Sequence, residues 1–172
     1  LDFTNEIVPR CGATDATVVP ECAVRTTSDT SVRATELPVS NIGGFTRGGY
    51  IGVSMGTTSQ EIRPIADFAG TTLVFDAPLR LAHGAGETVR NVSPPLGDVA
   101  VPTIVVDAPT PGTTLALGAA TTFLFHCSDG TGVGVEACEG PTTIDTSAPG
   151  PVSVRVRAWD TNGNVATRSV TD

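Results

Sequence analysis

The clearest pattern along the chain is an alternation of apolar and polar residues with a period of two. Over residues 152–158, valine or alanine occupies every second position and serine or arginine the positions between. Such a strand has one buried and one solvated face, because successive side chains point to opposite sides. The pair Asn162-Gly163 that follows is typical of a tight hairpin. We therefore expect an antiparallel last strand over 164–171.

Similar short runs recur along the whole chain and are separated by glycine-rich turns, where glycine supplies positive φ angles. No window keeps the i, i+3, i+4, i+7 spacing of an amphipathic helix for more than about one turn. We therefore predict an all-β fold. The expected strands are residues 31–34, 36–39, 50–55, 61–65, 71–75, 87–92, 103–106, 113–117, 121–127, 134–138, 142–145, 152–160 and 164–171.

The sequence Ser-Pro-Pro-Leu-Gly-Asp at 93–98 interrupts this pattern. Because proline removes a hydrogen-bond donor and favours turns, a sheet is not expected to continue through it. We predict two tandem small β domains, residues 1–93 and 101–172, joined by a linker over 94–100. The first is expected to be a β-sandwich or barrel. The number of short strands in the second suits an Ig-like sandwich.

The composition supports short strands and tight turns, with 19 Gly, 13 Pro and only 16% charged residues. The 10 basic residues are all arginine, and with 18 acidic residues the formal net charge is −8 at pH 7. Such a surface repels a phosphate backbone, so nucleic acid is not expected as a partner. No run of 18 apolar residues occurs, so no membrane-spanning helix is expected.

The four cysteines form two close pairs along the chain, Cys11 with Cys22 and Cys127 with Cys138. Each pair encloses a short polar loop that a disulfide can close, and sequential pairing is the prediction. In the chain-entropy description, such a bridge adds about 2.5–3 kcal/mol of stability. A zinc site needs a closer spacing of cysteine or histidine, although His126 adjoins Cys127. Disulfides indicate an oxidising compartment.

Four motifs stand out in the C-terminal half: Phe-Leu-Phe-His-Cys-Ser-Asp-Gly at 123–130, Cys-Glu-Gly-Pro at 138–141, Asp-Thr-Ser-Ala-Pro-Gly at 145–150 and Val-Arg-Val-Arg-Ala-Trp-Asp-Thr-Asn-Gly-Asn at 154–164. Together they resemble the Ig-like repeats of bacterial cell-surface and secreted proteins, over about residues 101–172. In those repeats the paired cysteines, the turn and the hairpin are structural. The resemblance therefore implies an Ig-like fold, the disulfide Cys127–Cys138 and no catalytic residue. Trp159 departs from the pattern, in which smaller residues are usual.

Residues 31–92 contain a further set of motifs: Leu-Pro-Val-Ser-Asn-Ile-Gly-Gly-Phe at 37–45, Gly-Tyr-Ile-Gly-Val at 49–53, Glu-Ile-Arg at 61–63, Thr-Thr-Leu-Val-Phe-Asp-Ala-Pro-Leu at 71–79 and His-Gly-Ala-Gly-Glu-Thr-Val at 83–89. With these motifs the segment is similar, more loosely, to a small β module that occurs as an accessory in bacterial extracellular enzymes and in phage surface proteins. This resemblance implies a location and a fold but no activity.

The chain offers few groups for catalysis, and we expect that it is not an enzyme. A hydrolytic triad must use His83, in a glycine-rich turn, or His126, beside a half-cystine. Neither is accompanied by a Gly-x-Ser-x-Gly elbow. By spacing, His83 with Asp76 comes closest to a catalytic pair.

Calcium is the one cofactor for which the sequence offers candidate ligands. Asp160, Asn162 and Asn164 alternate in the predicted hairpin, and Asp129 and Asp145 lie on loops that the fold can bring near. The pattern lacks the Gly at position six and the distal Glu of an EF-hand loop. The same residues also suit a tight turn without a metal, and the structural interpretation is preferred.

Two kinds of surface can meet a partner. Arg155, Arg157 and Arg168 are expected to form a basic stripe for an anionic partner, or simply the solvated face of a strand. Exposed aromatic residues stack on sugars in carbohydrate-binding modules, but a content of only 5% argues against a broad sugar platform. The stacking candidates are Tyr50, Phe68 and Trp159.

The N-terminal stretch 1–8 has part of a period-two pattern, and because it begins without Met it is expected to be a processed or trimmed end. It can pair with its own sheet, add as a strand to a neighbouring subunit's sheet edge, or be a stray terminus. The residues of the candidate inter-subunit strand are Leu1, Phe3, Ile7 and Val8.

Three hypotheses for function follow. The first is a non-catalytic structural or adhesive subunit of an extracellular assembly, on a cell surface or a virion surface, with a protein partner that includes a second copy of itself. The alternative is a carbohydrate- or partner-binding accessory module of a larger secreted enzyme. The third is a small hydrolase, which predicts a buried histidine with a perturbed pKa.

Overall fold

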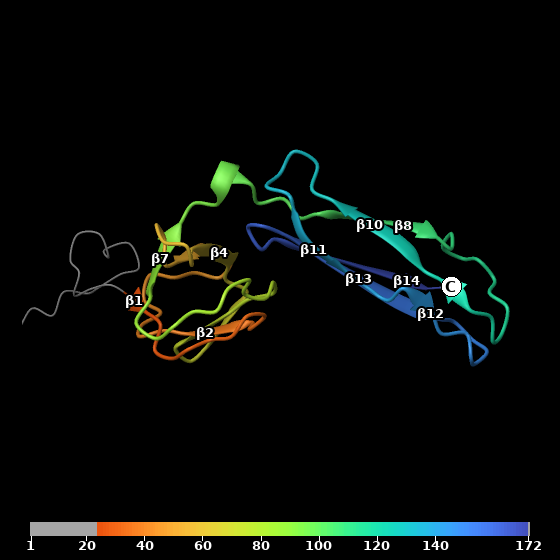
Figure 1. Cartoon of the computed structure of the whole chain (residues 1–172), viewed down its shortest axis with the longest axis horizontal. Coiled ribbons are helices and arrows are strands. Elements are labelled where there is room, and N and C mark those ends of the chain that lie inside the picture. The colour runs from red at the N-terminus through yellow and green to blue at the C-terminus, as the bar shows by residue number, and fades with distance from the viewer. Residues whose placement is uncertain (1–23, 172) are drawn as a thin grey trace, which may run out of the picture. The chain divides into compact units, whose positions relative to one another are not determined.

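A computed structural model describes residues 24–171, and these residues are all-β, as the period-two pattern predicts (Figure 1). All strand pairs within this part of the chain are antiparallel, and no α-helix occurs in it. No helix of the described residues is long and apolar enough to cross a membrane. The chain divides into an N-terminal unit that ends at Ser93 and a C-terminal unit that begins at Pro94.

The N-terminal unit consists of two antiparallel sheets, in the orders β1-β7-β3-β4 and β2-β6-β5. They are separate sheets that share one core, which is the sandwich alternative for this unit. Its strands are β1 (Val24–Arg25), β2 (Glu36–Pro38), β3 (Tyr50–Val53), β4 (Glu61–Pro64), β5 (Asp67–Ala69), β6 (Thr72–Val74) and β7 (Thr88–Val92).

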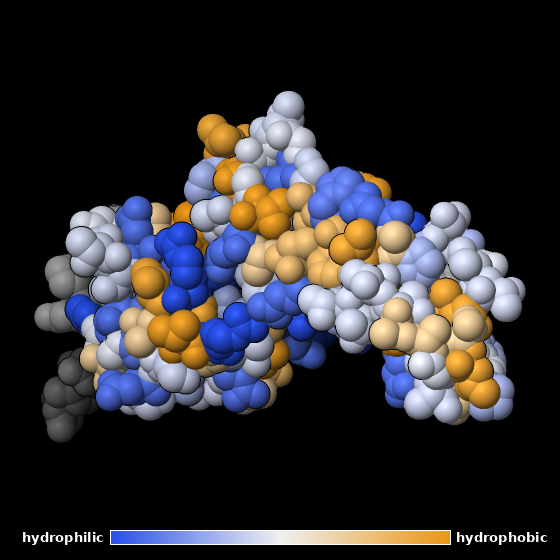
Figure 2. All heavy atoms as spheres, turned by 45° about the vertical axis from the view of Figure 1, so that its right-hand side comes forward, coloured by the Kyte–Doolittle hydropathy of each residue, from blue (hydrophilic) through white to orange (hydrophobic). Residues whose placement is uncertain are grey.

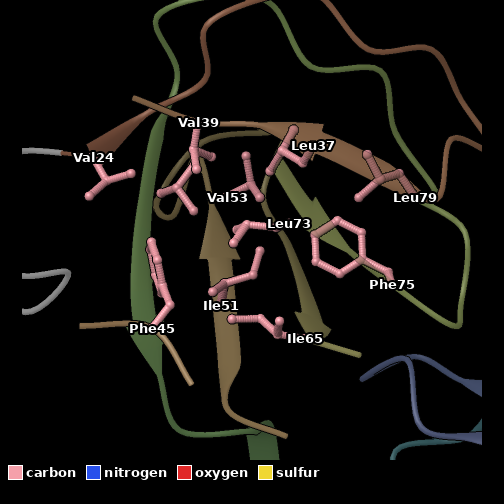
Figure 3. Close-up of a cluster of buried hydrophobic side chains, with 11 residues drawn as sticks. Val24, Leu37, Val39, Phe45, Ile51, Val53, Ile65, Leu73, Phe75 and Leu79 are labelled. Carbon is pink, nitrogen blue, oxygen red and sulfur yellow. The ribbon is translucent and has the colours of Figure 1, made fainter. Parts of the chain in front are cut away.

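The core of this unit lies where side chains of both sheets converge (Figure 3). Leu37 of β2, Ile51 of β3 and Leu73 of β6 have no exposed surface. Burial of a side chain of this size contributes about 1.5–3 kcal/mol, so the cluster is the main source of this unit's stability. The expected strand 31–34 is a turn instead, because Arg33 has a φ of 68° and its backbone N–H donates to the Leu79 carbonyl oxygen.

The C-terminal unit contains a three-stranded sheet, β11-β13-β14, and two two-stranded sheets, β10-β8 and β12-β9 (Figure 1). Its core draws on Ile104 from β8 as well as on Val156 and Val170 from the three-stranded sheet. Its strands are β8 (Thr103–Ala108), β9 (Thr121–Thr122), β10 (Leu124–Ser128), β11 (Val135–Glu139), β12 (Thr143–Ile144), β13 (Ser153–Asp160) and β14 (Val165–Thr171).

The strand with the strongest sequence pattern is β13, and its pattern predicts its faces correctly over residues 153–158. Val154, Val156 and Ala158 are buried, whereas Arg155 between them is exposed. The hairpin after it is confirmed, with Gly163 at a φ of 85°, and β14 returns antiparallel to β13. The expected strand 113–117 is not formed, because turns at 110–113 and 116–119 bend this glycine-flanked segment.

A disulfide joins Cys127 of β10 to Cys138 of β11, with a Cα–Cα distance of 5.9 Å. Since β10 and β11 belong to different sheets, the bond ties the two sheets together. Cys11 and Cys22, like the candidate inter-subunit strand of Leu1, Phe3, Ile7 and Val8, lie outside the described residues.

Removal of this disulfide is expected to destabilise the C-terminal unit alone. Replacing Cys127 and Cys138 together with alanine should lower its free energy of unfolding by about 2.5–3 kcal/mol, because the unfolded chain loses a closed loop. Trp159 is the chain's single tryptophan and Tyr50 its single tyrosine, so urea unfolding followed by each residue reports one unit. An equal loss of unfolding free energy in the transition followed by Tyr50 would contradict this expectation.

Residues 93–102, between β7 and β8, are called the connector. It holds one short 3₁₀ turn, Pro95–Gly97. From Pro94 onward it belongs to the C-terminal unit.

Candidate metal centre

The hairpin between β13 and β14 buries three polar residues, Asp160, Asn162 and Asn164, with exposures of 0, 1 and 6%. The Asp160 carboxylate accepts hydrogen bonds from the backbone N–H of Asn164 at 2.9 Å and from its Nδ2 at 2.7 Å. The backbone N–H of Gly163 donates to the Asp160 carbonyl oxygen, which closes the turn. The turn therefore holds a fully buried carboxylate in a fixed position.

Three carboxylates meet at this hairpin, those of Asp98, Asp129 and Asp160, with one oxygen from each within 4.8 Å of the others. They are called the acidic cluster. Asp98 comes from the connector, Asp129 from the loop between β10 and β11, and Asp160 from the end of β13. Three segments that are distant in sequence thus bring their negative charges to one point.

Backbone amides hold the other two carboxylates in place. The N–H of Val133 donates to Asp98 Oδ2 at 3.0 Å, and the N–H of Gly134 donates to Asp129 Oδ2 at 2.8 Å. A Cβ on Gly132 would overlap an oxygen of each of these two side chains. The space between the two carboxylates therefore exists only because residue 132 is glycine.

The two asparagines play a different part from the one that the sequence suggests. Asn162 Nδ2 donates to the carbonyl oxygens of Pro95 and Asp98, at 3.2 and 3.1 Å, and Asn164 Nδ2 lies 3.4 Å from the latter. Their amides therefore hold the connector, and Asp98 supplies the additional carboxylate. Sequence reasoning missed Asp98 because it lies in the expected linker.

Asp145, which was expected near the hairpin, is exposed and does not belong to the acidic cluster. Its carboxylate accepts from the N–H of Ser147 at 2.9 Å. Hydrogen bonds from Ser147 lower the pKa of Asp145, which is the behaviour of an ordinary turn aspartate. It therefore offers a matched control for the cluster.

The electrostatics of the acidic cluster are unfavourable without a counter-charge. Burial raises the pKa of Asp160 and the repulsion by Asp129 and Asp98 adds to it, against the lowering by the hydrogen bonds from Asn164. Two unit charges at the outer limit of 4.8 Å repel by about 3.5 kcal/mol at an effective dielectric constant of about 20. Among residues 24–171, no cation contributes to the pKa of Asp160.

One oxygen of the acidic cluster also lacks a partner, although Asp129 as a whole is only half-buried. The Oδ1 atom of Asp129 is buried and accepts no hydrogen bond from any described residue. A buried oxygen without a partner costs about 1–3 kcal/mol, more for a charged group. A bound cation would satisfy this oxygen and neutralise the repulsion together.

The donor set selects the kind of cation. It consists of carboxylate oxygens, with no histidine or cysteine in the acidic cluster, and such hard ligands suit Ca²⁺ or Mg²⁺ rather than zinc. Calcium accepts six to eight oxygens in adaptable geometry, whereas Mg²⁺ demands a near-ideal octahedron. Ligands from three loop segments fit calcium better.

The N-terminal unit contains a second group of buried charges, Glu61, His83 and Glu87, called the His83 cluster. The His83 ring has no exposed surface; its Nε2 lies 3.5 Å from Glu61 Oε1 and its Nδ1 2.7 Å from Glu87 Oε2. The expected pairing of His83 with Asp76 is replaced by these two glutamates. Glu61 Oε2 also accepts from the backbone N–H groups of Arg80 and Leu81.

This arrangement lacks the order of a catalytic triad. Ser54 Oγ donates to Glu87 rather than to His83, and both ring nitrogens of His83 face carboxylates. Since the ring is enclosed, it reaches no substrate in this conformation. The His83 cluster binds the segment before β7 to β4, and this supports a structural role.

Stability of the N-terminal unit should depend on pH through His83. Burial lowers the pKa of His83, but Glu61 and Glu87 outweigh it, so the net shift is upward; the pKa of Glu87 is lowered. The stabilisation by His83 is full below the pKa of about 6.5 that histidine has in the unfolded chain, and it is lost as pH rises through the higher pKa of the folded state. The stabilisation by Glu87 is lost at acidic pH, as pH falls through its lowered pKa. Urea unfolding followed by Tyr50 should give a higher midpoint at pH 6 than at pH 8.5, and equal midpoints would contradict this.

The expected stacking aromatics are not a sugar platform. Trp159 is only 2% exposed and donates from Nε1 to Glu136 at 3.3 Å, so the prediction of an exposed ring is wrong. Tyr50 and Phe68 are half-buried.

The expected basic stripe is also not continuous. Arg168 lies opposite Val156 in the β13–β14 register, on the other face from Arg155 and Arg157. Its Nη1 donates to the Ile104 carbonyl oxygen at 2.8 Å, so it links β14 to β8.

A pocket of about 490 Å³ lies elsewhere in the C-terminal unit. Apolar and small side chains with some threonines line it, from two loops. Figure 2 shows hydrophobic residues on one face of the molecule in several groups, the widest of them a band at the centre of the view, among hydrophilic ones. The lining residues are Gly112, Thr113, Thr114, Leu115, Leu117, Thr146, Ala148, Pro149, Gly150, Pro151 and Val152.

Comparisons with protein-family models, curated proteins and solved structures found no match to this chain. Conclusions about function therefore rest on the geometry of the chain's own residues.

Proposed function

We propose that the chain is a non-catalytic structural or adhesive module of an extracellular assembly, and that calcium stabilises its C-terminal unit. The observation that carries the proposal is the acidic cluster, where a fully buried Asp160 meets two further carboxylates and the buried Asp129 Oδ1 has no partner. A site of this kind binds a cation to hold loops together. It supplies no nucleophile.

The chemistry favours a place outside the cell. Extracellular modules bind calcium with Kd values of about 10⁻⁴–10⁻³ M, which a site with three protein carboxylates can reach. The disulfide Cys127–Cys138 adds support, since such bonds persist in oxidising compartments. The enclosed His83 supports a non-catalytic role for the N-terminal unit.

Isothermal titration calorimetry of the full, non-reduced chain tests the calcium part. We expect one calcium per chain with a Kd of about 10⁻⁴–10⁻³ M, and weaker binding of magnesium. Asp145→Asn should bind as the unchanged chain does, because this aspartate lies outside the acidic cluster. Absence of calcium binding by the unchanged chain would overturn the proposal.

The assembly part is tested by solution mass and electron microscopy of the same protein at several concentrations with calcium. Filaments or defined oligomers are the expected result. A monomer at all concentrations would contradict self-assembly and favour the accessory-module alternative.

A second candidate function rests on the pocket of the C-terminal unit. Its volume of about 490 Å³ lies within the range of small-molecule sites, about 300–1,000 Å³, and its walls combine apolar side chains with threonine hydroxyls. This observation favours a binding module for a carbohydrate or a peptide. Glycan and peptide array binding that is lost in Leu115→Asp would support it.

A further inference from the structure

Over residues 93–101 the connector has no buried side chain, and only its last residue, Pro102, is buried where β8 begins. Leu96, Val99 and Val101 are its larger apolar residues, and they are 84, 65 and 54% exposed. Burial of apolar surface therefore contributes little to the position of residues 93–101. The docking of this part of the connector must depend on polar contacts.

These polar contacts all reach the two loops that carry the rest of the acidic cluster. Asn162 Nδ2 donates to two connector carbonyl oxygens, at Pro95 and Asp98. Asp98 Oδ2 accepts from the N–H of Val133. The connector is thus bound at one point, beside Asp129 and Asp160.

The charge at this point opposes docking. Asp98 arrives on the connector, while Asp129 and Asp160 belong to the body of the C-terminal unit, so docking brings a third negative charge to two others. Without a cation this repulsion favours release of the connector. A bound cation turns the same three charges into an attraction.

We propose that calcium in the acidic cluster acts as a latch that holds the connector on the C-terminal unit. This rests on the proposed function, and it adds a role that calcium-dependent stability alone does not require. With the latch closed, Ser93 and Pro94 alone separate β7 from the first bound connector residue, Pro95. With the latch open, the free chain extends to β8. Calcium concentration thereby sets the length of flexible chain between the two units.

Hydrogen exchange of the full, non-reduced chain, read by mass spectrometry on the peptide that covers 93–101, tests the latch. At about 10 mM calcium and a Kd of about 10⁻⁴–10⁻³ M, the closed form gains a factor of about 10 to 100 over the open one. Exchange of this peptide should slow by up to that factor relative to EGTA with magnesium. Peptides of the N-terminal unit should not respond.

The substitution Asp98→Asn distinguishes the role of the Asp98 charge in the latch from the role of this side chain in the fold. The asparagine oxygen can still accept from Val133, but the third charge is absent, so connector exchange should no longer depend on calcium. Asp145→Asn should keep the full response. If calorimetry shows calcium binding while connector exchange stays unchanged, the latch is wrong and the proposed function stands. If calcium does not bind, both are wrong.

Discussion

Replacing His83 with alanine is expected to lower the free energy of unfolding of the N-terminal unit by about 3–5 kcal/mol. The reason is that the Glu61 carboxylate, whose side chain is 1% exposed, loses the imidazole beside its Oε1. Removing one partner of a buried pair leaves the other charge uncompensated, and this costs far more than a surface contact. A unit of marginal stability loses much of its folded population by such a change.

Urea unfolding of the full chain, followed separately by Tyr50 and Trp159, measures this effect. The Tyr50 transition should move and the Trp159 transition should not, because the two reporters lie in different units. His126→Ala is the matched control: His126 pairs with Asp107 on the surface, so its loss should cost at most about 1 kcal/mol. Equal losses of unfolding free energy in the two variants would show that the His83 cluster does not stabilise the N-terminal unit.

Asp129→Asn is expected to abolish the calcium response of the C-terminal unit and to raise the stability of this unit in EGTA. In EGTA the variant should be more stable than the unchanged chain by about 1–3 kcal/mol, because the amide removes one of three repelling charges. In calcium it should gain nothing, because a carboxylate ligand is absent.

The measurement is urea unfolding followed by Trp159 in about 10 mM calcium and in EGTA. Asp145→Asn should behave as the unchanged chain under both conditions. If Asp129→Asn were destabilised equally with and without calcium, Asp129 would be a turn residue and not a cation ligand.

Much of the local structure could be predicted from the sequence. The alternation over residues 153–158 of β13 predicts which of them are buried, because a strand with one wet face has a fixed period of two; it fails at Trp159, which is buried. The Asn162-Gly163 hairpin and the closing of Cys127 with Cys138 are likewise local, since each depends on a turn or a short loop.

The two charged clusters could not be predicted in the same way. Asp98 joins the acidic cluster only because the connector folds back on the hairpin, and no periodicity in the sequence reports this. His83 lies in a glycine-rich stretch that suggests an exposed turn, yet Glu61, 22 residues earlier on β4, encloses it. Trp159 is buried because β11 pairs beside it, through Ala137.

The free energy of unfolding of the C-terminal unit, measured with and without calcium, shows whether a cation in the acidic cluster stabilises this unit. With the full, non-reduced chain and Trp159 as the reporter, about 10 mM calcium should add about 1.4–2.7 kcal/mol over EGTA, as follows from a Kd of about 10⁻⁴–10⁻³ M. The gain should saturate with calcium concentration and should be absent from the Tyr50 transition. Identical Trp159 transitions in calcium and in EGTA would show that calcium does not stabilise the C-terminal unit.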